Sequence, residues 1–184
     1  MTFIPAIALV LHIHNLAGAP PAVVSGGGAE LTRAYPRLAI AFDEDCDRAD
    51  RASDVIRVVV LREAGGALRR GEEPAMGAAV RTAGGARVVY VFFDRVRAEA
   101  ERHGVSTALV LACVIEHELG HLLLTGAAHS RDGLMQRIWR AEDFRSANRG
   151  QLRFSPDELA LLESGSVRRR ESEVGHVIGG PAPR

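Results

Sequence analysis

Residues 110–135 read VLACVIEHELGHLLLTGAAHSRDGLM, and this stretch decides how the rest of the chain is interpreted. At its centre, His117 and His121 have the H-E-x-x-H spacing. An α-helix turns by about 100° per residue, so residues four apart lie on one face of the helix. Two imidazoles placed in this way can hold one side of a tetrahedral zinc site. Glu118 is expected to reach a water on the metal without being a ligand itself.

The flanking residues favour a buried metal-binding helix. Val110, Val114 and Leu124 continue the face that carries the two histidines, so apolar turns are expected on both sides of the metal. Ser106 is expected to cap the start of the helix. Gly126 is expected to end it in a left-handed conformation.

A third ligand is expected downstream, because a catalytic zinc ion usually has three protein ligands and one open position. His129 follows the helix closely, and it is the third ligand that we prefer. The alternative is a carboxylate farther along the chain, from Glu142 or Asp143. The sequence therefore predicts a zinc site made by His117, His121 and one of these three residues.

A helix with two histidines, a glycine break, a third histidine and a nearby methionine resembles the metzincin group of zincin metalloproteases. Their pattern is H-E-x-x-H-x-x-G-x-x-H followed by a Met-turn. The stretch is also similar to a little-characterised bacterial zincin-like family with H-E-x-G-H-L-L-L, then H-S, then G-[IL]-M and a tryptophan. The matching positions here are 117–124, His129-Ser130, 133–135 and Trp139. The resemblance implies a zincin-like fold and a peptide or protein substrate.

The chain departs from the metzincin pattern in the loop after the helix. The position of the metzincin glycine is occupied by Leu124, and the nearest glycine is Gly126. His129 follows His121 by eight positions instead of six. The loop is two residues longer, so His129 must reach the metal by a different path.

Other residues near the motif are expected to be structural. Gly120 would let the helix pack closely on the sheet, and Trp139 would pack against the underside of the site. Cys113 is more readily interpreted as a buried, inert thiol than as part of the site. His12 and His14 lie on one side of a predicted strand and are interpreted as surface residues.

The composition is that of a soluble globular protein with one domain. The chain has 184 residues, of which 47% are hydrophobic and 25% charged. The formal net charge is zero, so nothing suggests a nucleic-acid partner. The absence of lysine excludes Schiff-base chemistry. Two cysteines make no disulfide framework, and no segment is long and apolar enough to predict a transmembrane helix.

Periodicity and turn residues predict an α+β fold, with a mixed twisted sheet packed on helices and a metal-binding helix following the sheet. One zincin-like domain is expected over 1–170, with a disordered tail over 171–184. The predicted strands are 7–14, 37–42, 55–61, 76–80 and 87–93. The predicted helices are 22–35, 94–103, a helix following Ser106, and 156–169.

The N-terminal residues do not make a convincing signal peptide. Residues 3–13 are apolar and Ala17-Gly18-Ala19 has the form of a cleavage site, but no basic residue precedes the run. We therefore expect a strand here. The expected location is the cytoplasm for the sequence as written, or outside the cell if a leader precedes it.

The expected function is zinc-dependent hydrolysis of peptide bonds. Zinc held by the histidines would activate a water molecule and polarise a carbonyl, and Glu118 would act as the general base. Two alternatives stay open at this point. One is a non-catalytic zincin fold used for binding or structure, and the other is a zinc hydrolase of non-peptide amides or esters.

Overall fold

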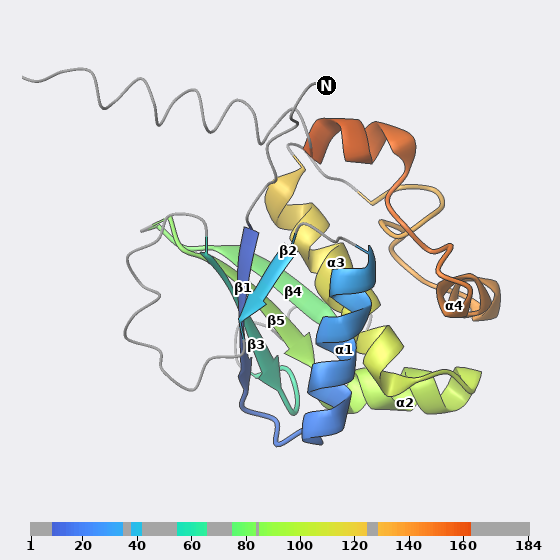
Figure 1. Cartoon of the computed structure of the whole chain (residues 1–184), viewed down its shortest axis with the longest axis horizontal. Coiled ribbons are helices and arrows are strands. Elements are labelled where there is room, and N and C mark those ends of the chain that lie inside the picture. Colours follow the sequence, from blue (N-terminus) through green and yellow to red (C-terminus); the bar gives the residue numbers. More distant parts are fainter. Residues whose placement is uncertain are drawn as a thin grey trace, which may run out of the picture.

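A mixed five-stranded sheet organises the computed structural model, which describes residues 9–34, 38–41, 55–65, 75–83, 85–124 and 129–162. The strands are β1 (Leu9–Asn15), β2 (Leu38–Ala41), β3 (Val55–Leu61), β4 (Gly77–Arg81) and β5 (Arg87–Phe92). Their order across the sheet is β2-β1-β3-β5-β4 (Figure 1). The first four strands in this order are parallel to one another, whereas β4 runs antiparallel to β5. In the described part of the chain, β4 is therefore an edge strand.

The helices gather to one side of the strands in Figure 1. They are α1 (Pro21–Ala34), α2 (Phe93–His103), α3 (Thr107–Leu123) and α4 (Ala141–Asn148). Residues 156–162 form a further helical segment at the end of the described chain. The helix α3 passes between α1 and the sheet edge formed by β4 and β5, and it contacts all three of these elements.

The five predicted strands are all present, each within about two residues of its expected bounds. The strand β3 explains why: alternate residues of its Val- and Ile-rich sequence are fully buried (Ile56, Val58, Val60), and the residues between them are half-buried. Such a pattern suits a strand whose one face is covered by helices.

The helix bounds correct several expectations. The helix α3 ends at Leu123, and Leu124 is already extended, so Gly126 does not cap it and lies outside the described residues. Ser106 is the N-cap residue but makes no side-chain capping bond. The helix α2 begins at Phe93, one residue before the expected Asp94. The helix α4 was not predicted, because its eight residues include only two that are buried.

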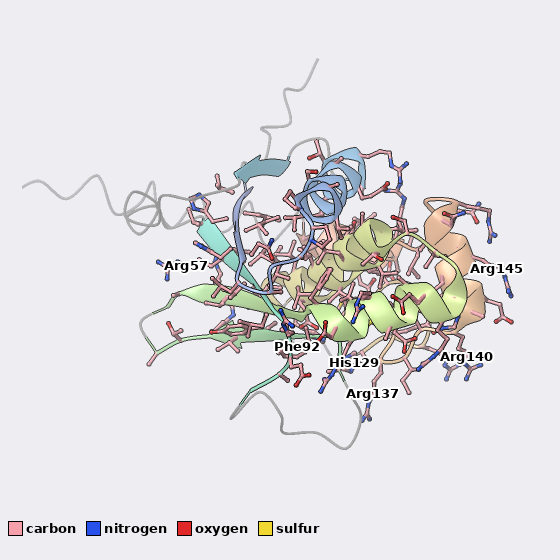
Figure 2. The ribbon with its side chains drawn as sticks, turned by 90° about the horizontal axis from the view of Figure 1, so that it is seen from below. Arg57, Phe92, His129, Arg137, Arg140 and Arg145 are labelled. Carbon is pink, nitrogen blue, oxygen red and sulfur yellow. The ribbon has the colours of Figure 1, made fainter. Side chains whose placement is uncertain are left out.

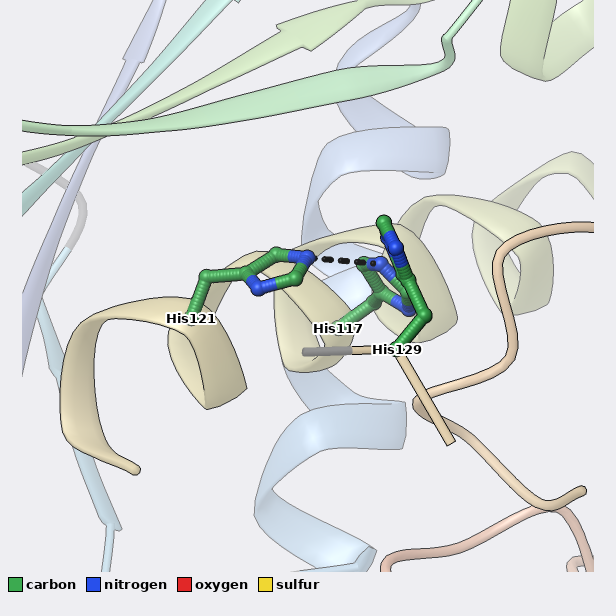
Figure 3. Close-up of side chains that lie close together, drawn as sticks. All are labelled: His117, His121 and His129. Atoms are coloured by element: carbon green, nitrogen blue, oxygen red, sulfur yellow. Dashed lines mark hydrogen bonds between the residues drawn. The ribbon is translucent and has the colours of Figure 1, made fainter. Parts of the chain in front are cut away.

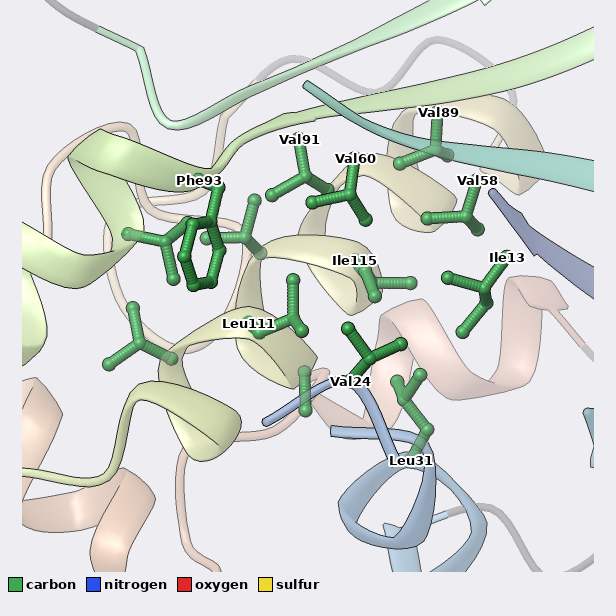
Figure 4. Packing of buried hydrophobic residues seen from close by; sticks show 14 of the residues in the cluster. Ile13, Val24, Leu31, Val58, Val60, Val89, Val91, Phe93, Leu111 and Ile115 are labelled. Carbon is green, nitrogen blue, oxygen red and sulfur yellow. The ribbon is translucent and has the colours of Figure 1, made fainter. Parts of the chain in front are cut away.

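Apolar side chains from the sheet, α1 and α3 form one core (Figure 4). Val58, Val60 and Val89 of the sheet face Ile115 of α3. Glycines on α1 bring the two helices close, since a Cβ atom at Gly27 would lie 3.0 Å from Leu111 Cδ2. The three glycines that weaken α1 as an isolated helix thus permit its packing.

The chain is a single α+β domain with a mixed sheet, in agreement with the predicted fold class. None of the described helices combines the length and apolar character that crossing a bilayer requires. The predicted tail at 171–184 lies outside the described residues, as do Cys46 and His176.

Candidate metal centre

The helix α3 presents His117 and His121 one turn apart with their ring nitrogens converging (Figure 3). The two Nε2 atoms are 3.1 Å apart, and the rings meet edge to face with centroids 4.8 Å apart. Two imidazoles on one tetrahedral zinc ion, with Zn–N bonds of about 2.0–2.1 Å, have nitrogens about 3.3 Å apart. The spacing of these two nitrogens therefore fits zinc.

His129 joins this pair from the segment that follows α3. Its ring centroid lies 5.3 Å from that of His117 and 4.9 Å from that of His121. One ring nitrogen from each of the three histidines lies within 4.8 Å of the others. His117 is buried, His121 is half-buried and His129 is exposed, so the cluster opens to solvent on the side of His129.

The outer nitrogen of His117 is fixed by the main chain. Its Nδ1 lies 2.8 Å from the carbonyl oxygen of Leu134, which can only accept a hydrogen bond. Trp139 donates its indole N–H to the same oxygen at 3.1 Å, and its ring packs edge to face on His117. With the proton on Nδ1, the Nε2 lone pair of His117 points into the cluster. Metal-binding histidines usually donate their other ring N–H to a carboxylate, carbonyl or water in this way, which fixes the tautomer and the orientation of the ring.

The electrostatics of the cluster favour neutral imidazoles. Burial lowers the pKa of His117 to about 4. Partial desolvation, and then the positive charge of Arg137, lower the pKa of His129. His129 and Arg137 lie near each other at the surface in Figure 2. Neutral histidine is the form that binds metal ions, so the lowered pKa values of His117 and His129 suit binding of a divalent cation.

Glu118 is buried against the edge strand β4. A Cβ atom at Gly77 would lie 2.8 Å from both Cγ and Oε1 of Glu118, so the carboxyl group occupies space that a side chain at position 77 would fill. Burial raises the pKa of Glu118 to about 8. The missing side chain of Gly77 therefore decides where this carboxyl group can lie.

Gly120 faces a different partner from the one that we expected. A Cβ atom there would overlap Met135 Sδ and lie 2.9 Å from Phe154, so this glycine packs on the loop after α3 and not on the sheet. Met135 is fully buried. The glycine between the two histidines thus makes room for the methionine of the Gly133-Leu134-Met135 turn, in which Gly133 has a φ of 79°.

The two alternative ligands lie outside the cluster. Asp143 accepts hydrogen bonds from the Arg140 backbone N–H at 2.7 Å and from Gln136 Nε2 at 3.1 Å, and so caps α4. Glu142 is exposed and lies 3.8 Å from Arg145. The structure brings His129, and neither carboxylate, to the histidine pair.

The remaining histidines and cysteine do not form a second centre in the part of the chain that is described. His12 and His14 are half-buried on β1, and His103 pairs with Glu99 at 3.3 Å. Cys113 is buried, and burial raises the pKa of its thiol well above the usual range. The prediction that Cys113 is buried is confirmed.

Comparison with protein-family models and with curated proteins gives no match. No protein-family model matches this chain, and no curated protein was found to be similar to it. The geometry of the three histidines and the position of Glu118 are therefore the basis for proposing a function.

Proposed function

We propose that this protein is a zinc-dependent metallopeptidase with a zincin-like, metzincin-like fold. His117, His121 and His129 would hold the metal, and Glu118 would act as the general base. The observation that carries the proposal is the convergence of three imidazoles at an opening to solvent. Structural zinc sites are closed by four protein ligands, whereas catalytic sites use three and keep one position open. Among the described residues, no fourth histidine, cysteine, aspartate or glutamate joins these three.

The chemistry divides between the metal and one side chain. Zinc bound at the cluster would supply Lewis acidity, which polarises a carbonyl group and makes water a stronger acid. Glu118 would accept the water proton on a carboxylate oxygen and then donate it to the leaving amine. Burial favours the protonated form of Glu118, whereas a nearby cation favours the ionised form. These opposing effects suit a group that must both take and give a proton near neutral pH.

The edge strand β4 supports a peptide substrate. It pairs only with β5 in the described sheet and carries Gly77, which borders Glu118. An extended peptide can bind such an edge through main-chain hydrogen bonds, as an added strand. A peptide bound along β4 would pass beside the proposed base, which is where the scissile bond must lie.

The two competing functions differ from this proposal in testable ways. A structural or binding role needs no base, so the glutamate that follows His117 in the H-E-x-x-H motif argues for catalysis. A hydrolase of non-peptide amides or esters would use the same residues. That alternative is separated only by the substrates that the protein turns over.

The test is a metal analysis of the purified protein, followed by digestion of a peptide library with and without a chelator. We expect one zinc per chain and cleavage that stops on chelation and returns with added zinc. His121→Ala should lose both zinc and cleavage. The matched control His14→Ala, on β1 and outside the cluster, should keep both. A protein that binds no zinc, or that cleaves peptides equally well after its removal, would contradict the proposal.

A further inference from the structure

The third ligand of the proposed site differs from the other two in how it is held. His117 and His121 belong to α3, whose backbone hydrogen bonds and apolar packing fix both positions. His129 is exposed and lies in an irregular segment. A metal ligand must nevertheless be oriented closely, and groups behind the ligands usually provide that orientation. The next residue, Ser130, makes the hydrogen bonds that hold this segment.

Ser130 is held at both its backbone and its side chain. Its N–H donates to the Met135 carbonyl oxygen at 2.8 Å, which ties the segment to a fully buried residue. Its hydroxyl group donates to Glu158 Oε1. The side-chain bond spans 28 residues and links the segment of His129 to the last described helix.

Glu158 is itself fixed by the start of that helix. Its second oxygen, Oε2, accepts the Ser155 backbone N–H at 2.7 Å. Its own N–H donates to Ser155 Oγ at 3.2 Å. The sequence pattern from Ser155 to Glu158 is a helix-capping box, and capping alone would explain only one of the two carboxylate oxygens. The other oxygen is used for Ser130.

We infer that Glu158 is a positioning residue for the proposed metal centre: through Ser130 it orients His129, so that the C-terminal helix forms part of the site. The inference rests on the proposed metal site. Glu158 is not one of the clustered ligands; it bonds to Ser130, and its negative charge also acts on His117, whose pKa it raises against the larger lowering by burial. Without the Ser130 to Glu158 bond, the segment of His129 keeps its backbone link to Met135 and loses its side-chain link to the helix.

The test compares zinc affinity in the full-length protein and three variants, measured by competition with a chromophoric chelator. Glu158→Ala and Ser130→Ala should each weaken zinc binding by about 10-fold or more, the effect of removing groups that orient metal ligands. Glu158→Gln should remain within about threefold of the native protein, because an amide can still bond to the Ser130 hydroxyl. Asp157→Ala, at the exposed neighbouring position, is the matched control and should leave the affinity unchanged.

A second measurement separates positioning of His129 from general loosening of the fold. Cobalt(II) replaces zinc, and its visible absorption is strong in four-coordinate sites and weak in six-coordinate ones. Ser130→Ala leaves the capping box intact, so its melting temperature should stay close to that of the native protein while its cobalt band weakens. The double variant Ser130→Ala/Glu158→Ala should bind zinc about as tightly as whichever single variant has the lower affinity, because both changes remove the same hydrogen bond.

The outcomes distinguish the two proposals. If the native protein binds no zinc, the metal centre and this inference fail together. If the native protein binds zinc but Ser130→Ala has the native affinity and the native cobalt band, the inference fails and the metal centre stands. Should Glu158→Ala fail to fold, Ser130→Ala decides alone, since it leaves the helix start unchanged.

Discussion

The two sides of α3 each carry a buried glutamate. Comparing them shows which features, besides burial, favour a catalytic role. Glu116 and Glu118 are 5% and 7% exposed, and burial raises the pKa of each to about 8. Glu118 belongs to α3, the helix that carries the histidine pair, and its side chain lies beside Gly77 of β4. Glu116 faces the other way, into a small cavity shared with Cys113 and Arg153.

Burial therefore raises the pKa of both carboxyl groups, but a raised pKa alone does not make either of them catalytic. Arg153 partly offsets the burial of Glu116, and the cavity around it holds no cluster of ligands in the described residues. Glu118 follows His117, one of the three clustered histidines, and borders Gly77 of the edge strand β4. A perturbed pKa marks a candidate site only when neighbouring groups can use it.

The largest contrast is expected in catalysis. Glu118→Gln should keep zinc bound and lower kcat/KM for a cleaved peptide by at least about 100-fold, because general acid and base catalysis contributes about 10²–10⁴-fold. Glu116→Gln changes the same group by the same atoms on the opposite side and should alter kcat/KM by less than about threefold. Equal losses in the two variants, measured with zinc content confirmed, would remove the distinction.

The next contrast is the dependence of stability on pH. A carboxyl group with a pKa of about 8 in the fold and 4.5 when unfolded holds its proton longer in the fold. The unfolding free energy should thus be highest below about pH 4.5 and fall as the pH rises through 8. Glu116→Gln carries no proton to lose, so it should be more stable than the native protein at pH 9 by on the order of a few kcal/mol.

Urea denaturation of the native protein and of Glu116→Gln at pH 5 and pH 9 measures this difference. The two proteins should differ little at pH 5. Added zinc should reduce the part of the slope that comes from Glu118, because a cation favours the ionised carboxylate, and should leave the part from Glu116. An equal difference between the two proteins at both pH values would contradict the assignment.

A smaller contrast concerns two glycines at the packing contacts of α3: Gly120 on α3 itself and Gly27 on the neighbouring α1. A methyl group at Gly120 would overlap Met135 Sδ and crowd Phe154, so Gly120→Ala should lower the unfolding free energy by about 1–3 kcal/mol. At Gly27 of α1 the methyl group meets the Leu111 side chain, at 3.0 Å from Cδ2 and 3.3 Å from Cγ, and lies in ordinary contact with the Ala108 carbonyl oxygen at 3.4 Å. The gain in helix propensity of about 1 kcal/mol offsets that contact, so Gly27→Ala should be nearly neutral. Thermal or urea unfolding of both variants checks the order.

The sequence predicts the parts of this molecule that depend on periodicity. The alternation in β3 and the H-E-x-x-H spacing of His117 and His121 each follow from local geometry, and both are present as expected. The place of His129 soon after the helix also predicts that it lies near the pair, as it does, although its loop is two residues longer than the metzincin spacing.

Partners that are distant in sequence could not be read in the same way. Nothing local indicates that Glu116 is buried, that Gly120 faces Met135, or that Glu158 bonds to Ser130. The helix α4 is short and mostly exposed, so its apolar pattern is weak. Gly126 predicts a later end for α3 than the structure shows, because Leu124 already adopts an extended conformation.

The Leu134 carbonyl oxygen has a consequence for how this centre can change over evolutionary time. It accepts from both His117 and Trp139, yet it belongs to the main chain and is present whichever amino acid occupies position 134. Point substitutions there can alter packing but cannot delete the acceptor. His117 therefore keeps its hydrogen-bond acceptor through any single substitution at position 134. Only a change in the backbone conformation of the turn would remove it.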